Sequence, residues 1–216
     1  MTTLLQIDAS ARLSKSHSRS LSRRFVTGWL ARRPADRVII RDVGANPPPP
    51  VTEAWIAAAF TKPEERTPAM VATLALSDAL VEELERADLL VAGVPMYNFG
   101  MPPSMKAYID NIVRVGRTFG FDRTRAGAPY WPMLAGKQLV TLSARGDYGY
   151  GDGQRIAHMN HVEPHLQTAF AYIGVTLTAS IAVEYDEFAD ERAAQSLRDA
   201  EAAVDRLVAA MTAAPR

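Results

Sequence analysis

The alternation of short apolar runs with helical stretches constrains the fold of this 216-residue chain most strongly. Parallel strands need a crossover connection, and a crossover helix buries one apolar stripe against the sheet. The length suits one domain with a sizeable core, so we expect a single unit over residues 1–216. Five apolar runs predict strands, at residues 4–8, 37–41, 88–94, 138–143 and 177–183. The expected fold is therefore α/β, a parallel sheet covered by helices on both faces with residues 88–94 at its centre.

Cap residues and apolar stripes at helical spacing predict five helices between and after these strands. The first has Ser16 or Ser18 as its cap and an apolar face that includes Leu30, the second runs from Thr67 to about residue 86, and the third runs from Pro102 to near Gly116. The fourth has Pro164 in its first turn and Gly174 just after its end, and the last carries an apolar stripe from Leu197 to Met211. The proline run at residues 47–50 predicts a stiff extended spacer. Residues 117–136 predict a long loop, and its aromatic content suggests a lid or a surface that faces a partner.

Charge and composition exclude several classes of function. Lys and Arg total 24 and Asp and Glu total 24, so no bulk basic field would hold nucleic acid or a membrane surface. The absence of cysteine removes thiolate catalysis, cysteine-based zinc sites and iron–sulfur clusters. No secretory signal pattern and no apolar run of membrane-spanning length is present, so we expect a cytoplasmic protein.

Motif searches exclude further classes. The first strand is not followed by GxGxxG, and no GKS or GKT, GxSxG or HExxH motif occurs, which disfavours classical NAD domains, P-loop NTPases, α/β hydrolases and zincins. His158, His161 and His165 are close in sequence, but Pro164 lies among them at a helix start. They need not share one face, and we predict no metal site.

The loop after the first strand is the strongest candidate for a binding site. In an open parallel sheet, ligands bind beyond the carboxyl ends of the strands, where the strand order reverses. Ser10, Ser14, Ser16 and Ser18 crowd this loop immediately before a helix. Hydroxyls, free backbone N–H groups and a helix N-terminus can hold a phosphate without net charge. The alternative is helix capping, which requires only one serine.

The loops after the third and fourth strands are also unusual. Residues 95–102 place Asn98 among two methionines, a tyrosine and a phenylalanine, which suits a flat aromatic ligand; a core turn explains the same pattern equally well. Residues 143–153 are rich in glycine, and Arg145 offers a fork of donors to an oxygen-rich ring edge. The alternative for the second of these loops is a flexible excursion.

Taken together, these residues resemble those of the FMN-dependent NADH-azoreductases, also called FMN-dependent NADH:quinone oxidoreductases. The resemblance covers nearly the whole chain, and the stretch Pro95-Met96-Tyr97-Asn98-Phe99 is its most specific element. Its other elements are Ser10, Ser16-His17-Ser18, Ser143 to Gly146, Arg41-Asp42, Asn46-Pro47, Leu76-Ser77-Asp78 and Thr118-Phe119. The family often has Ser-Arg-Gly-Gly where this chain has Ser143-Ala144-Arg145-Gly146-Asp147, and residues 148–153 read as an extension.

This resemblance implies a flavodoxin-like, doubly wound, five-stranded parallel sheet in the order 2-1-3-4-5, and a homodimer with one FMN per subunit at the interface. It implies that Ser10, Ser16, His17 and Ser18 hold the FMN phosphate and ribityl chain. Met96, Tyr97, Asn98 and Phe99 would line the isoalloxazine, and Ser143, Ala144, Arg145 and Gly146 would border its pyrimidine edge. Phe121 and Tyr172 stand where the family places aromatic substrate contacts, although Tyr172 at helical spacing could equally be a core residue.

The expected activity is transfer of a hydride from NADH through FMN to quinones and azo compounds in a ping-pong scheme. The flavin carries the chemistry, so we name no catalytic residue. One rival is a flavodoxin-type electron carrier, which the neutral charge and the aromatic loop oppose because carriers usually steer by an acidic surface. The other rival is a related FAD-dependent quinone reductase.

Overall fold

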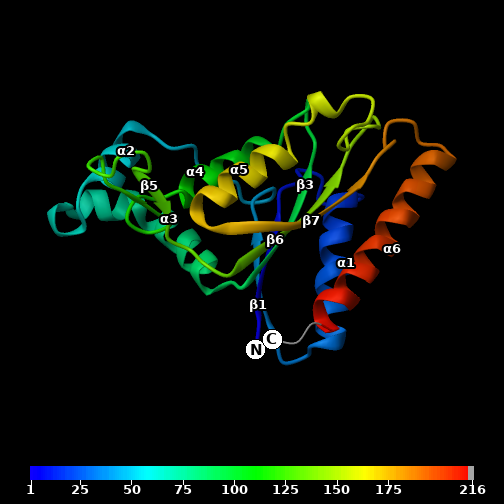
Figure 1. Cartoon of the computed structure of the whole chain (residues 1–216), viewed down its shortest axis with the longest axis horizontal. Coiled ribbons are helices and arrows are strands. Elements are labelled where there is room, and N and C mark those ends of the chain that lie inside the picture. Colours follow the sequence, from blue (N-terminus) through cyan, green and yellow to red (C-terminus); the bar gives the residue numbers. More distant parts are fainter. Residues whose placement is uncertain (214–216) are drawn as a thin grey trace.

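The structure is a computed structural model, and it describes residues 1–213. Its main sheet has five parallel strands in the order β2-β1-β3-β6-β7 (Figure 1). Their bounds are β1 Thr3–Asp8, β2 Arg37–Asp42, β3 Leu89–Pro95, β6 Lys137–Ala144 and β7 Val175–Val183. All five predicted strands are confirmed to within two residues at each end. The expected order 2-1-3-4-5 is confirmed as well, because β6 and β7 are the fourth and fifth strands of this sheet.

Helices cover both faces of the sheet (Figure 1). Their bounds are α1 His17–Arg32, α2 Glu53–Phe60, α3 Pro68–Arg86, α4 Pro103–Ile112, α5 Glu163–Ile173 and α6 Glu191–Ala213, with short 3-10 turns at Pro63–Glu65 and Ala157–Met159. One core joins the sheet to α3, α4 and α5, and a second joins the opposite face to α1 and α6. The caps expected at Ser16 and Thr67 are confirmed, since each hydroxyl accepts a hydrogen bond from an amide of the first helical turn.

The central strand β3 shows why a continuous apolar run predicts a sheet that is buried on both faces. All seven of its residues are buried. Leu90, Ala92 and Val94 face the core with α3, α4 and α5, whereas Leu89 and Val91 face α1 and α6. Alternate side chains of a strand point to opposite faces, so an entirely apolar strand needs a helical layer on each.

Three expectations about the elements need correction. The third helix was expected to reach Gly116, but α4 ends at Ile112 and Val113 is its cap. Helix α2 was not expected after the proline spacer. Within the expected loop 117–136, Phe119–Phe121 (β4) and Tyr130–Pro132 (β5) pair as a short antiparallel sheet.

Within residues 1–213, none of the helices combines the length and the apolar content needed to span a lipid bilayer.

Gly174 ends α5 in the left-handed conformation, at φ 96°. A Cβ at this position would lie 1.9 Å from the carbonyl oxygen of Leu134, which precedes β6. Glycine is therefore required both by the backbone angle and by the close approach of another segment.

We predict that Gly174→Ala lowers the free energy of unfolding by about 3 kcal/mol, because the strain of a positive φ adds to a backbone overlap. Urea unfolding at neutral pH measures the change. Gly127→Ala is the matched control, since Gly127 has φ 77° but open space around it, and should cost about 1 kcal/mol. Equal losses in the two variants would show that the contact with Leu134 is unimportant.

Candidate functional site

A hollow of about 310 Å³ opens where β1, β3 and β6 end and α1 begins. The rule for open parallel sheets places ligands at this edge. Nine of the residues expected at a cofactor site line the hollow together: Ser10, Ser16, His17, Met96, Tyr97, Asn98, Ala144, Arg145 and Gly146. Arg12, Pro95, Asp186 and Glu187 complete the lining and were not among the expected residues.

The start of α1 lies close to the sheet because the strand residues beneath it are either polar side chains that bond to the helix or a glycine without a side chain. Gln6 and Asp8 of β1 are buried under α1, and Ser22 of α1 donates a hydrogen bond of 2.6 Å to Asp8. On the neighbouring strand, a Cβ at Gly93 would lie 2.9 Å from the backbone oxygen of Ser18. Glycine there lets the first turn of α1 approach the sheet, which places that turn at the edge of the hollow.

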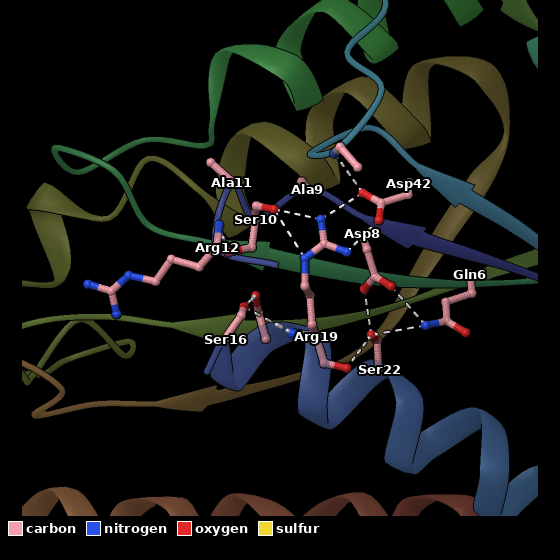
Figure 2. Close-up of polar contacts among 12 residues, drawn as sticks. Gln6, Asp8, Ala9, Ser10, Ala11, Arg12, Ser16, Arg19, Ser22 and Asp42 are labelled. Atoms are coloured by element: carbon pink, nitrogen blue, oxygen red, sulfur yellow. Dashed lines mark hydrogen bonds and ion pairs between the residues drawn. The ribbon is translucent and has the colours of Figure 1, made fainter. Parts of the chain in front are cut away.

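Arg19 fixes the loop between β1 and α1 (Figure 2). Its side chain is buried, donates to the carbonyl oxygen of Ser10 through Nη2 at 2.6 Å and Nε at 3.1 Å, and forms two bonds of 2.6 Å with the carboxylate of Asp42. Asp42 ends β2, so one guanidinium ties together the ends of two strands and the first helix. A Cβ at Gly44 would lie 2.2 Å from the Ser10 oxygen, so this side of the loop is closely packed.

Two carboxylates of this cluster have shifted pKa values in opposite directions. Burial raises the pKa of Asp8, and the hydrogen bond from Ser22 and the nearby Arg19 only partly offset the lost hydration. The hydrogen bonds from Arg19 lower the pKa of Asp42 below its usual value. Asp42 is therefore a stable anion that compensates the buried guanidinium.

The first turn of α1 presents unpaired donors to the hollow. The first N–H groups of a helix have no carbonyl partner within the helix, and here they belong to His17 and Ser18. The Ser16 hydroxyl lies at the same end, 3.2 Å from the Ser18 hydroxyl. This set of hydroxyl and amide groups suits a phosphate.

The second wall is the turn that follows β3. Tyr97 and Gly100 exchange backbone hydrogen bonds of 2.8 and 3.1 Å, and Asn98 and Phe99 between them have positive φ angles. The Tyr97 hydroxyl accepts a hydrogen bond of 3.2 Å from the amide of Ala11, so this wall is tied to the serine-rich loop. The turn is therefore a shaped surface exposed to the hollow, while the methionines on either side of it, Met96 and Met101, pack on the core.

The third wall differs from the expectation for Arg145. Its guanidinium is buried and already donates to Glu163 at 2.6 Å and to Glu184 at 3.1 Å. The expected fork of free donors toward a ring edge is therefore engaged by carboxylates of α5 and of the loop after β7. The hydroxyl of Ser143, one strand position before Ala144, is buried without a hydrogen-bond partner within residues 1–213.

Loop residues after β7 close the hollow from the side. His17 Nε2 lies 3.0 Å from Asp186, and the side chain of Glu187 lies against Gly146, where a Cβ would be 2.4 Å from it. These two acidic residues follow the carboxyl end of a predicted strand. The strand-end rule could have found them if it had been applied to the fifth strand as well as to the first, third and fourth.

Five expected residues do not line this hollow. Ser18 and Ser143 are fully buried behind it, and Phe99 is exposed beside it. Phe121 and Tyr172 belong instead to an aromatic cluster, which consists of Phe119, Phe121, Tyr130 and Tyr172. Their expected contact with substrate would therefore require a second subunit.

No metal centre is visible in the described part of the chain, residues 1–213, where no three His, Cys, Asp or Glu side chains gather as metal ligands would. His158 lies in the 3-10 turn Ala157–Met159, and His165 lies in the first turn of α5.

The residues of the hollow fit a flavin mononucleotide. The donors at the start of α1 can hold its phosphate, and the Tyr97–Asn98 turn offers a wall for its flat ring. At the end of β6, Ala144, Arg145 and Gly146 line the hollow where its polar ring edge is expected. A sheet of this order with a ligand hollow at the strand ends defines a flavodoxin-like protein.

Comparison with known proteins agrees with this class. A family model described as flavodoxin-like fold matches residues 2–207. The FMN-dependent NADH:quinone oxidoreductase 2 of Colwellia psychrerythraea is 41% identical over 96% of this chain and 98% of its own. The FMN-dependent NAD(P)H:quinone oxidoreductase 1 of Pseudomonas aeruginosa is 45% identical over 87% of this chain and 89% of its own. The crystal structure of an azoreductase from Bacillus anthracis shares the fold, with a TM-score of 0.84, 20% identity and coverage of 96% of this chain and 99% of its own. The chain belongs to the family of FMN-dependent NADH:quinone oxidoreductases.

We predict that Arg19→Gln lowers the free energy of unfolding by about 3 kcal/mol at pH 7, because it leaves Asp42 and the Ser10 carbonyl without their partner. The lowered pKa of Asp42 contributes stability above the usual pKa of an aspartate, and this contribution is lost as the pH falls and Asp42 is protonated. The difference between wild type and variant should therefore narrow from pH 7 toward acid. Urea unfolding across this range measures it.

Arg41→Gln is the control for this measurement. Arg41 precedes Asp42 and forms a two-bonded pair with Glu83, but its side chain is more exposed and makes no contact with the Ser10 loop. We expect a loss of about 1 kcal/mol or less. A loss at Arg19 no larger than that at Arg41 would contradict the role given to Arg19.

Proposed function

We propose that this protein binds FMN in the hollow between α1 and the ends of β1, β3 and β6, and that it transfers electrons from NADH to quinones and to azo compounds. The proposal rests mainly on one observation: two chemically different walls face each other in a hollow at the carboxyl-terminal edge of the sheet. One wall offers hydroxyl and amide donors, and the other is the shaped turn Tyr97–Asn98. Full-length relatives named for this activity support the assignment.

Each wall has a separate task in this proposal. Ser10, Ser16 and the amides of His17 and Ser18 bind the phosphate, and the dipole of α1 favours its charge. Met96, Tyr97, Asn98 and Phe99 orient the ring, while Ser143 to Gly146 border its polar edge. FMN, when bound, supplies the hydride chemistry. The chain's own residues act by position, and backbone N–H groups at the ring edge stabilise negative charge that develops there.

Donor and acceptor would use the same open face of the ring in turn, since the hollow offers one stacking wall. This predicts ping-pong kinetics with parallel double-reciprocal lines.

The decisive experiment is anaerobic reduction of the purified protein. It should be yellow, lose its colour with NADH and regain it with a quinone. Reduction by dithionite but not by NADH would support an electron carrier instead. Extraction and identification of the flavin tests the other rival, because an FAD-dependent reductase would release FAD.

We further propose that the protein works as a cytoplasmic homodimer with its site at the subunit interface. Two groups stand out among the large apolar side chains that remain exposed. On α2 and α3 they are Ile56, Phe60, Val71 and Leu76, and near the aromatic cluster they are Phe121, Tyr130, Met133 and Tyr172. Contiguous apolar patches are uncommon on monomers and are typical of interfaces. A second subunit would bring the aromatic cluster of one chain to the hollow of the other.

We predict that Ser16→Ala combined with Ser18→Ala weakens FMN binding. The Ser16 hydroxyl would bond to the phosphate anion, which contributes about 1.5 to 3 kcal/mol, and the buried Ser18 hydroxyl lies 3.2 Å from it and orients it. Riboflavin, which lacks the phosphate, should bind both proteins alike in a flavin titration. Ser16 also caps α1, so Thr67→Ala, which removes the equivalent cap of α3, controls for lost helix stability. Unchanged FMN affinity in the double variant would contradict the phosphate assignment.

We predict that Phe121→Ala raises the KM for quinones and changes acceptor preference, because it removes a stacking surface contributing about 0.5 to 1.5 kcal/mol. Thermal stability and FMN content should change little, since the ring is 44% exposed. Ile40→Ala, which removes an exposed apolar side chain of the edge strand β2 outside the aromatic cluster, should leave acceptor preference unchanged. A marked loss of thermal stability with an unchanged acceptor profile would make Phe121 a structural residue.

A further inference from the structure

A second hollow, of about 850 Å³, lies beside the first on the outer side of α1. The loop 12–17 and the first two turns of α1 form its walls, and we call it the basic hollow. It shares Arg12, Ser16, His17 and Asp186 with the proposed cofactor hollow. The remaining lining residues are Leu13, Ser14, Lys15, Arg19, Ser20 and Arg23. The two hollows are therefore neighbours with a common wall.

Positive charge is concentrated in this part of a chain that is neutral as a whole. Residues 9–35 contain seven Lys and Arg residues and no Asp or Glu. Two of these arginines are neutralised by carboxylates from elsewhere, Arg19 by Asp42 and Arg24 by Asp205. Arg19 is thus already paired, and the charge of the basic hollow comes from other residues.

Three cations of the basic hollow keep their charge available. Lys15 and Arg23 are exposed and form no ion pair within residues 1–213. Arg12 is 69% exposed and reaches Asp186 only at 3.5 Å. In Figure 2 the Arg12 side chain points away from the Arg19 cluster. Exposed cations are usually only solvated, but here they line one hollow together with the hydroxyls of Ser14 and Ser20.

The position of the basic hollow indicates which anion it suits. A dinucleotide donor that stacks its nicotinamide on a ring in the cofactor hollow must extend its remaining parts beyond that hollow. Its diphosphate carries two negative charges and follows the nicotinamide ribose. A cationic hollow that adjoins the cofactor hollow at Arg12 and Asp186 can receive this group without a second nucleotide motif, which the sequence lacks.

We propose that the basic hollow binds the diphosphate of the nicotinamide dinucleotide donor through Arg12, Lys15 and Arg23. This proposal rests on the function proposed above, and it assigns to the chain a recognition element for the donor that is separate from the site of the flavin. The donor's nicotinamide end then enters the cofactor hollow past Arg12 and Asp186, the shared residues that are not assigned to the FMN phosphate.

Binding of ADP-ribose tests the proposal without turnover. ADP-ribose carries the diphosphate and adenosine of the donor but no nicotinamide, and calorimetry on the FMN-loaded protein measures its Kd. The double variant Lys15→Gln with Arg23→Gln should raise this Kd about tenfold, and added salt should weaken binding to the wild type more than to the variant. Arg24→Gln is the matched control, because Arg24 adjoins Arg23 but pairs with Asp205 outside the hollow.

Steady-state kinetics give a second measurement. Reduced nicotinamide riboside lacks both phosphates and the adenosine, so it can use the cofactor hollow alone. The ratio of the KM for NADH to the KM for the riboside should rise about tenfold in the double variant. The ratio should stay at the wild-type value in Arg24→Gln.

Several outcomes would overturn the proposal. One is a wild type that does not bind ADP-ribose, and another is a double variant that binds it as tightly as the wild type does. A loss confined to 2′-phospho-ADP-ribose would assign the hollow to a 2′-phosphate. Weaker FMN binding with unchanged riboflavin binding would assign it to the phosphate of the flavin. Failure of the proposed function would be seen separately, as a protein without flavin or one that NADH does not reduce.

Discussion

The contact on which the site depends is the buried guanidinium of Arg19. A charge removed from water is tolerated only when partners of suitable geometry replace its hydration. Asp42 supplies the opposite charge and the Ser10 carbonyl takes two further donor bonds, so the guanidinium is well satisfied. These partners come from the ends of β2 and β1, while Arg19 itself comes from the first turn of α1. The path of the serine-rich loop follows from this one side chain, and every group that the hollow offers to a phosphate lies on that loop or at its end.

In the same region, buried polar residues position the start of α1 at some cost to the stability of the fold. Elsewhere, α1 packs through Leu21, Phe25 and Trp29 onto an apolar face of the sheet. At its start it rests on Gln6 and Asp8, whose burial raises the pKa of the carboxyl group. An apolar pair at these positions would pack better. The polar pair instead holds the first helical turn over Gly93 by hydrogen bonds, where its free N–H groups open toward the edge of the sheet.

The sequence predicts the strands and most helices of this fold well because each is determined by residues close together in the chain. An apolar run such as residues 88–94 indicates a strand, and a cap such as Thr67 indicates the start of a helix, without reference to distant segments. Helix α2 escaped prediction because its apolar side chains, Ile56 and Phe60 among them, do not form a buried stripe. At the site, the rule that ligands bind at strand ends located the hollow. The sequence around Arg145, however, could not show that its guanidinium donates to Glu163 and Glu184. Such pairings are made between segments distant in sequence, as are the contacts of Asp186 and Glu187.

The contacts of Arg19 with Asp42 and the Ser10 carbonyl also limit which substitutions this part of the sequence tolerates. Replacing Arg19 alone leaves the Asp42 carboxylate and the Ser10 carbonyl without a partner, and replacing Asp42 alone leaves a buried positive charge unpaired. Each single replacement therefore gives a less stable protein. Gly44 allows no compensation by a larger neighbour, since even a Cβ would overlap the Ser10 oxygen. A substitution at any one of these three positions is therefore costly unless the others change with it. Substitutions in the turn after β3 or in the loops after β6 and β7 would alter how a ligand is held, whereas substitutions at these three positions would alter the path of the serine-rich loop itself.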